Sequence, residues 1–172
     1  SNWTSVNNAM ADDGAVAISL ASDARTQSTE IELTEYELST VTIADLIPAA
    51  SVILGIEVEI DRYLDPIGPP VVTTESAYDL NVTLTGLTGA VENKANAHLA
   101  WPTVGLTKVT YGGPTDRWGN ELDVYEVRST GFGVRFSTKI EGATGNSILL
   151  KVDAIRVKVY YQPQTTKVYI RN

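Results

Sequence analysis

Residues 56–61 alternate between apolar and acidic side chains, and no other feature of the chain limits its fold as strongly. Successive side chains of a β-strand point to opposite faces, so this period of two predicts a strand between a core and solvent. The same period recurs in residues 14–22, 30–45, 78–85 and 147–161. Periodicity typical of helices is scarce. The pattern therefore predicts an all-β protein.

Turn-forming sequences separate the expected strands, at residues 47–49 and at the Pro- and Gly-rich residues 65–70. With 172 residues the chain is long enough to bury one core. About seven or eight strands without a crossover helix predict an antiparallel β-sandwich that is jelly-roll-like. We expect the sandwich domain to span residues 14–162, after an N-terminal arm at 1–13 and before a C-terminal strand or tail at 163–172.

The apolar side chains that share one phase within each expected strand predict the core. They are Ile56, Val58, Ile60, Leu80, Val82, Leu84, Phe132, Val134, Phe136, Ile155, Val157 and Val159. In the last strand the apolar positions change phase between Val152 and Ile155. A bulge near Asp153 and Ala154 would restore the facing by inserting one residue. A strand that crosses from one sheet to the other at this point is the alternative.

The composition argues against several classes of function. The formal net charge is −8 and the sequence pI about 4.6, so phosphate backbones repel the chain and direct nucleic-acid binding is not expected. Cysteine is absent and His98 is the one histidine, which removes thiol chemistry and histidine-based metal sites. We therefore expect no cofactor and no metal, and the missing disulfides favour assembly in a reducing cytoplasm. No membrane helix is expected, because no apolar run approaches the roughly 20 residues that one needs.

No arrangement of side chains predicts an enzyme. Glu57, Glu59 and Asp61 lie two residues apart on one expected strand, so their carboxylates share a face. Glycoside hydrolysis needs two carboxyls on opposite sides of a cleft, about 5–10 Å apart. The row therefore predicts an outer face that meets solvent or a basic neighbour. No nucleophile motif lies near His98, so no Ser-His-Asp triad is expected either.

A turn-rich segment at residues 111–120, together with a tryptophan shortly before it, supplies the candidate binding residues. They are Trp101, Tyr111, Asp116, Arg117, Trp118 and Asn120. Aromatic faces beside polar side chains are typical of sugar-binding sites. The alternative, which we favour, is that the indoles close the end of the sandwich and fix the loop. In that case the segment is the best candidate for an interface with another protein.

Four pieces of the chain are distinctive in combination. They are Trp3 with Asn7-Asn8 and Asp13-Gly14; residues 47–60 (IPAASVILGIEVEI); Trp101-Pro102 with residues 111–119 (YGGPTDRWG); and Phe132-Gly133-Val134 with residues 153–161 (DAIRVKVYY). Taken together, over nearly the whole chain, these pieces resemble a family of small β-sandwich proteins of tailed bacteriophages and prophages. Members of that family are regarded as structural proteins of the virion.

The resemblance implies a non-enzymatic virion structural protein, either a capsid decoration protein or a component of the tail or fibre. Such a protein acts through contacts with other virion proteins and with further copies of itself as a homo-oligomer. It is located in the virion, which is assembled in the host bacterial cytoplasm. The alternative is a glycan-binding or host-receptor-binding module of a tail fibre or baseplate. The resemblance carries no catalytic residue over to this chain.

Both ends of the chain carry short arms. Residues 1–13 are polar but contain Trp3 and Met10, and residues 167–171 read as a short strand with alternating side chains. Arms of this kind either close their own sheet or add to the sheet of a neighbour. In a multimeric shell or fibre, the second arrangement links one copy to the next.

Overall fold

The computed structural model describes residues 3–10, 14–20, 30–34, 37–38, 41–66, 75–142 and 148–164. Its elements are β1 (Trp3–Thr4), η1 (Val6–Ala9), β2 (Ala17–Leu20), β3 (Ile31–Thr34), β4 (Glu37–Leu38), β5 (Val41–Thr42), α1 (Ile43–Leu46), β6 (Ser51–Pro66), β7 (Ser76–Thr85), β8 (Thr107–Gly112), α2 (Val124–Val127), β9 (Gly133–Glu141) and β10 (Ile148–Pro163). Most of the described residues that belong to helices or strands lie in strands, which confirms the all-β prediction.

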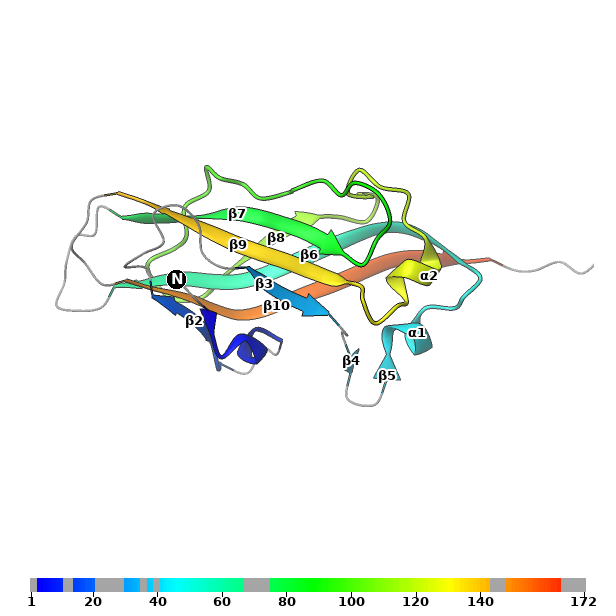
Figure 1. Ribbon diagram of the computed structural model, residues 1–172, viewed down its shortest axis with the longest axis horizontal. Helices are drawn as coiled ribbons and strands as arrows, with labels where there is room; N and C mark the ends of the chain where they lie inside the picture. Colours follow the sequence, from blue (N-terminus) through cyan, green and yellow to red (C-terminus); the bar gives the residue numbers. More distant parts are fainter. Residues whose placement is uncertain are drawn as a thin grey trace, which may run out of the picture.

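Within the described residues the strands form two antiparallel sheets that pack as a sandwich. The five-stranded sheet has the order β1-β2-β10-β6-β8, and the three-stranded sheet has the order β3-β9-β7. Strands β4 and β5 form a small separate ribbon. Figure 1 shows β6 and β10 running along most of the elongated body, with β7 and β9 beside them. The predicted antiparallel β-sandwich is therefore confirmed.

Strand β6 is the strand that the alternation at residues 56–61 predicts. Ile56, Val58 and Ile60 have no exposed surface, whereas Glu57 and Glu59 are only partly buried. The alternation places the apolar set toward the three-stranded sheet and the acidic set on the outer face. Burying such a row of branched side chains removes apolar surface from water. This stabilises the fold by about 25 cal/mol for each Å² of apolar surface buried.

Strand β10 contains the predicted bulge. It stays beside β6 along its whole length, and the register shifts between Val152 and Ala154, so Asp153 is the extra residue. Val152 and Ile155 are both buried although their positions differ in phase. The bulge is therefore confirmed, and the crossing between sheets is not observed.

The core prediction is wrong at one position of β7. Nine of the twelve predicted residues are buried, and they are Ile56, Val58, Ile60, Val82, Leu84, Phe132, Val134, Phe136 and Ile155. Val157 and Val159 are half-buried and pack against the core. Leu80 is half-buried as well, because a register shift between Asp79 and Asn81 changes the phase of the strand. Asp79 is buried in its place.

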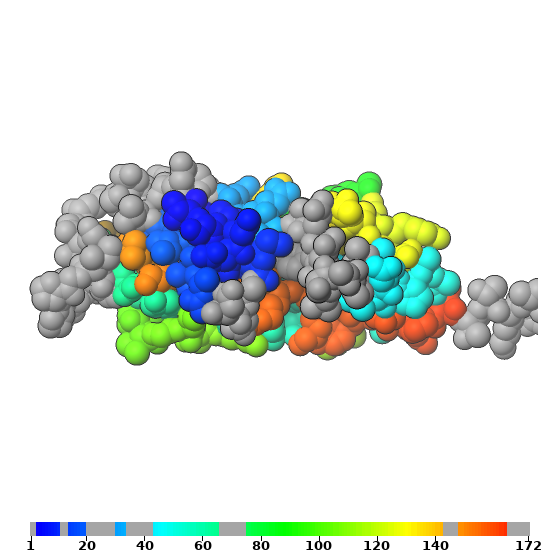
Figure 2. Space-filling model, turned by 90° about the horizontal axis from the view of Figure 1, so that it is seen from below, coloured from blue at the N-terminus to red at the C-terminus, as the bar shows by residue number. Residues whose placement is uncertain are grey.

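The described N-terminal residues close their own sheet. Strand β1 pairs with β2, with Trp3 opposite Ser19. The Trp3 side chain is buried, and its ring centroid lies 6.3 Å from that of Phe136. Figure 2 shows the N-terminal residues covering the middle of one face of the body. Residues 11–13 of the N-terminal arm and residues 165–172 of the C-terminal one lie outside the described residues.

The acidic row of β6 meets basic neighbours on the outer face, which confirms one of the two environments predicted for it. Each carboxylate of the row pairs with a cation on β10 or β8, the two strands that flank β6. The pairs are Glu57–Lys158 at 2.6 Å, Glu59–Lys108 at 3.2 Å, Asp61–Arg156 at 2.7 Å and Asp65–Lys151 at 2.6 Å. Cross-strand pairs of opposite charge stabilise a sheet and fix its register.

We expect the variant Glu57→Gln to lose less stability in acid than the unaltered protein. The hydrogen bond from Lys158 holds the pKa of Glu57 below its ordinary value of 4.5, while desolvation opposes this and Tyr160 assists it. A carboxyl whose folded pKa is lowered stabilises the protein above its unfolded pKa. That contribution disappears as the pH falls from about 4.5 through the folded pKa. Glu57→Gln lacks this carboxyl and therefore does not lose the contribution.

Urea unfolding at a series of pH values between 7 and 3 measures this difference. The gap in unfolding free energy between the unaltered protein and Glu57→Gln should shrink toward low pH. Lys158→Met removes the main cause of the lowered pKa, so its gap in unfolding free energy from the unaltered protein should also shrink toward low pH. The double variant should be little less stable than either single variant. A gap that stays constant over the whole pH range would show that the pair does not perturb Glu57.

Candidate functional site

The predicted segment at residues 111–120 folds back onto the beginning of β6 and is held there by backbone hydrogen bonds. The Gly113 N–H donates to the Ile56 carbonyl at 3.0 Å, and the Ile56 N–H donates to the Asp116 carbonyl at 3.0 Å. These bonds continue the pairing of β6 beyond Gly112, the last residue of β8. We call residues 113–118 the pinned loop.

Trp118 anchors the pinned loop. Its side chain has no exposed surface, and its Nε1–H donates to the Ile56 carbonyl at 2.8 Å. Its own carbonyl accepts from the Glu92 N–H, also at 2.8 Å. The Trp118 backbone has φ of 56°, which is uncommon for a residue with a side chain. The surrounding contacts must therefore offset the cost of this conformation.

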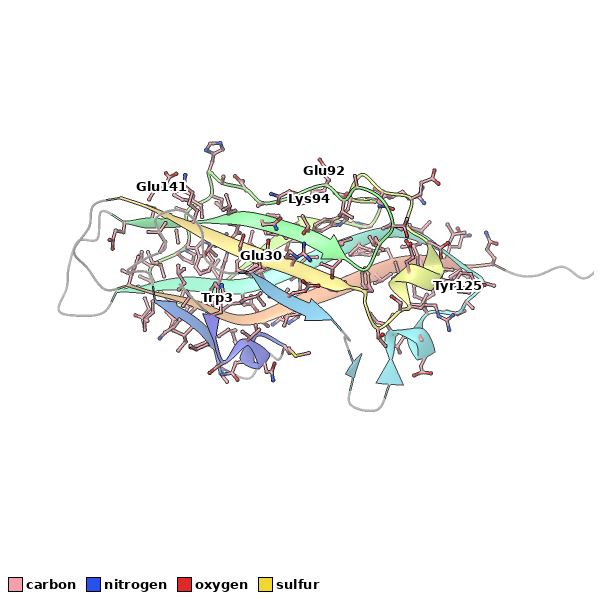
Figure 3. All side chains as sticks on the ribbon, in the orientation of Figure 1. Trp3, Glu30, Glu92, Lys94, Tyr125 and Glu141 are labelled. Atoms are coloured by element: carbon pink, nitrogen blue, oxygen red, sulfur yellow. The ribbon has the colours of Figure 1, made fainter. Side chains whose placement is uncertain are left out.

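The Asp116 carboxylate fixes the turn that leads into Trp118. Its Oδ1 accepts from the Trp118 backbone N–H at 2.8 Å, and its Oδ2 lies 3.0 Å from the Lys94 ammonium. Partial burial would raise the pKa of Asp116, but the Trp118 N–H and Lys94 outweigh it and lower this pKa. Lys94 also pairs with Glu92 at 2.7 Å, and Figure 3 shows these two side chains together at the edge of the body.

Two glycines allow the backbones of the pinned loop and β6 to come this close. A Cβ on Gly55 would lie 2.5 Å from the Gly113 carbonyl oxygen and 2.6 Å from the carbonyl carbon of Pro114. A Cβ on Gly112 would lie 2.3 Å from the Ile56 carbonyl oxygen, and its φ of 75° favours glycine in any case. Real side chains do not reach such distances, so the close contact requires glycine at both positions.

The structure divides the six predicted site residues into buried and accessible ones. Trp101, Tyr111 and Trp118 are 3%, 6% and 0% exposed. Asp116 and Asn120 are half-buried, and the Asn120 amide donates to two backbone carbonyls of residues 88–90, at 2.9 and 3.1 Å. Arg117 is exposed. The buried indoles present no face on which a sugar can stack in this structure: Trp118 anchors the loop, and Trp101 bonds to Asp79 and stacks on Phe136 in the core.

A buried ion pair joins the two sheets beneath this region. Arg62 comes from β6 and Asp79 from β7, and they are 1% and 0% exposed. The Arg62 Nε and Nη2 atoms lie 3.0 and 2.9 Å from Asp79 Oδ2. Removing two charges from water costs several kcal/mol per ion, so each charge needs its partner and further hydrogen bonds.

Two of the predicted aromatic residues supply those bonds. The Trp101 Nε1–H donates to Asp79 Oδ1 at 2.7 Å, and the Tyr111 hydroxyl donates to Asp79 Oδ2. The Arg62 guanidinium also lies over the Trp101 ring, 5.0 Å from its centroid. Burial raises the pKa of Asp79, and Arg62, Tyr111 and Trp101 oppose that rise. We call Arg62, Asp79, Trp101 and Tyr111 the Asp79 cluster.

Arg62 and Asp79 are not among the site residues predicted from the sequence, although the alternation in β6 indicates that Arg62 faces inward. Arg62 continues the inward phase of Ile56, Val58 and Ile60 along the same strand. A cation on a core-facing position requires an anion in the core, because an unpaired buried charge is too costly. No comparable local signal marks Asp79, since its inward position depends on the bulge in β7.

Neither a metal site nor a membrane-spanning helix is found in the part of the chain that the structure describes. No three His, Cys, Asp or Glu side chains there are grouped to hold a metal ion. No helix there combines the length and the apolar character needed to cross a bilayer.

No protein-family model, curated protein or solved structure matches the chain. Fold and site together define an antiparallel β-sandwich with a loop pinned to β6 and a buried Asp79 cluster between its two sheets.

Proposed function

We propose that this chain is a non-enzymatic structural protein of a bacteriophage virion, located on the capsid or in the tail or fibre. In this proposal it works through contacts with other proteins. The sequence resemblance, which extends over nearly the whole chain, supports the bacteriophage assignment. The structure supports the mode of action, because the candidate aromatic residues Trp101, Tyr111 and Trp118 are buried and other apolar side chains are exposed at the surface.

The order of the strands supports a jelly-roll reading of the sandwich. From β2 onward the long strands alternate between the two sheets, and β2 lies beside β10, the last strand. In this reading the segment near Lys94 takes the place of an eighth strand, because the Lys94 N–H donates to the Val82 carbonyl of β7 at 2.9 Å. Jelly rolls build many viral capsid proteins, but they also build lectins and other proteins.

The observation that carries the protein–protein assignment is a group of exposed apolar side chains at one end of the body. We call it the end surface, and it consists of Leu46, Leu54, Tyr125 and Tyr161. The pinned loop borders it, because Gly113 and Pro114 lie against Gly55, next to Leu54. Soluble monomers rarely leave clustered apolar side chains exposed without a binding role. In the proposed function the end surface and the pinned loop together form the contact with the neighbouring protein.

Purified particles provide the test. Virions produced by the host that carries this gene should contain the chain by mass spectrometry, and a cryo-EM reconstruction should show the sandwich in its density. Particles from which the gene has been deleted serve as the control and should lack that density. Density on the capsid lattice would identify a decoration protein, and density on the tail would identify a tail or fibre component. Particles that never contain the chain would overturn the proposed function.

A further inference from the structure

The end surface has a composition that indicates what binds to it. Its side chains are 68% (Tyr125), 46% (Leu46), 40% (Leu54) and 37% (Tyr161) exposed. For large apolar and aromatic residues of a sandwich with a complete core, these are high values. The surface therefore remains available for a partner.

The residues of the end surface come from α1, β6, α2 and β10, four elements that meet at this end. The pairing of β6 with β10 places Ile53 opposite Tyr161, so these two side chains share a face and Val52 lies on the other face of the sheet. The Tyr161 hydroxyl donates to the Leu46 carbonyl of α1 at 3.1 Å, and Arg128, directly after α2, donates to the Ala44 carbonyl at 2.9 Å. Figure 2 shows α1, α2 and the end of β10 together, and Figure 3 shows Tyr125 at the same end.

Carboxylates border the apolar side chains of the end surface. Asp45 precedes Leu46 in α1 and is exposed. Asp123 is exposed as well, and its Oδ1 accepts from the Tyr125 N–H at 2.6 Å, which places it beside that ring. Glu126 follows Tyr125 in α2, but it is half-buried and its carboxylate accepts from the Thr88 N–H and hydroxyl, so it is not part of this border. The matching ligand is therefore a short apolar segment flanked by cations.

Residues 165–172 of the same sequence have this composition. They read Thr-Thr-Lys-Val-Tyr-Ile-Arg-Asn, so Lys167 and Arg171 flank three apolar or aromatic residues. They follow Gln164, whose N–H donates to the Ala50 carbonyl at 2.6 Å, one residue before β6 begins. This segment therefore leaves the described structure at the end surface itself.

We propose that residues 167–171 of one copy of this chain bind the end surface of a second copy. Thr165 and Thr166 alone separate Gln164 from Lys167, and tight two-residue reversals favour Gly, Asn or Asp, none of which is present there. This favours a second copy over the chain's own end surface. Because surface and segment share one end, two copies that meet end to end exchange their segments reciprocally. The result is a closed dimer with two-fold symmetry.

This inference rests on the protein–protein part of the proposed function and makes it specific. Its test does not depend on the particle, because it measures binding between purified components. A negative result here leaves the location of the chain in virions untouched, and a negative result with the particles leaves the dimer untouched.

The first experiment titrates a synthetic peptide of residues 164–172 into the chain shortened to end at Gln164. The shortened chain keeps the end surface and lacks the segment, so saturable binding to it is expected. Leu46→Lys in the shortened chain should weaken binding at least about tenfold, since it places a cation where Lys167 and Arg171 need carboxylates. Leu99→Lys is the matched control, because Leu99 is also 46% exposed but is not part of the end surface, and it should leave binding unchanged.

The second experiment measures the mass of the full chain by sedimentation over a range of concentrations. We expect a dimer at high concentration, and a monomer for the shortened chain and for the double variant Lys167→Glu/Arg171→Glu. Thermal unfolding checks that each variant is folded. If Leu46→Lys does not fold, Leu54→Lys replaces it, with Leu106→Lys as its control, because their exposures are 40% and 42%.

Three results would overturn the proposal. The first is a peptide that fails to bind the shortened chain. The second is a dimer that persists after residues 165–172 are removed, which would place the contact elsewhere. The third is a full chain that stays monomeric while the peptide binds the shortened chain, which would mean that each segment covers its own end surface.

Discussion

Replacing Asp79 by Asn is expected to lower the free energy of unfolding by about 3–5 kcal/mol. The substitution keeps the shape of the side chain but leaves the Arg62 guanidinium buried without a counter-charge. It also replaces an acceptor of the Trp101 and Tyr111 hydrogen bonds by a weaker or wrongly oriented one. Denaturant unfolding at pH 7 measures the effect.

The control for Asp79→Asn is the exposed ion pair of Arg135 and Glu32, at 3.1 Å on the three-stranded sheet. Glu32→Gln removes a formal charge in the same way but at the surface, where such pairs contribute less than about 1 kcal/mol. A loss for Asp79→Asn as small as that for Glu32→Gln would contradict the prediction. It would indicate that the Asp79 carboxyl is already protonated at neutral pH.

Replacing Trp118 by Ala should cost about 3–5 kcal/mol of unfolding free energy and release the pinned loop. The indole is wholly buried, so its removal leaves a cavity and deletes one of the two hydrogen bonds that the Ile56 carbonyl accepts. Denaturant unfolding measures the cost. Hydrogen exchange measures the release, because the Ile56 and Gly113 amides are protected by the bonds between loop and strand and should exchange faster in the variant.

Tyr125→Ala provides the matched control for this prediction, since it deletes an aromatic side chain that is 68% exposed. Its effect on stability should stay within about 0.5 kcal/mol. If Trp118→Ala leaves the exchange of the Ile56 amide unchanged, the loop is held by its backbone bonds alone. In that case the indole is not its anchor.

Much of the sandwich follows from local patterns. The alternation at residues 56–61 predicts β6 and the facing of its side chains, and the change of phase in the last strand predicts the bulge at Asp153. The same reasoning fails at Leu80, where alternation predicts burial and the structure shows that Leu80 is itself the extra residue of a bulge between Asp79 and Asn81. In β10 the apolar residues change from even to odd positions at the bulge, so the sequence predicts it. In β7 the apolar residues from Tyr78 to Leu84 all occupy even positions, so the sequence gives no sign of the bulge.

The candidate site, like the sandwich, could be predicted from the sequence only in part. Sequence alone identifies the segment at residues 111–120 and its aromatic residues, because Gly, Pro and Trp in one turn-rich stretch are conspicuous. It leaves open whether the indoles face outward or inward. The answer depends on Gly55, far away in the sequence, which lets the loop approach β6 closely enough to bury Trp118. It depends equally on Asp79, which accepts the hydrogen bond of Trp101 inside the sandwich.

By itself the sequence determined most of the segments that form strands and which face of β6 carries the acidic row, because alternation and turn residues act between neighbours in the chain. It did not predict β8 (Thr107–Gly112). It also determined the class of fold. Only the tertiary structure decided that Arg62 and Asp79 meet in the core, that Trp118 is buried beneath a loop, and that the end surface stays exposed. These outcomes depend on register shifts and on contacts between residues from different strands, and no local pattern of side chains encodes such contacts.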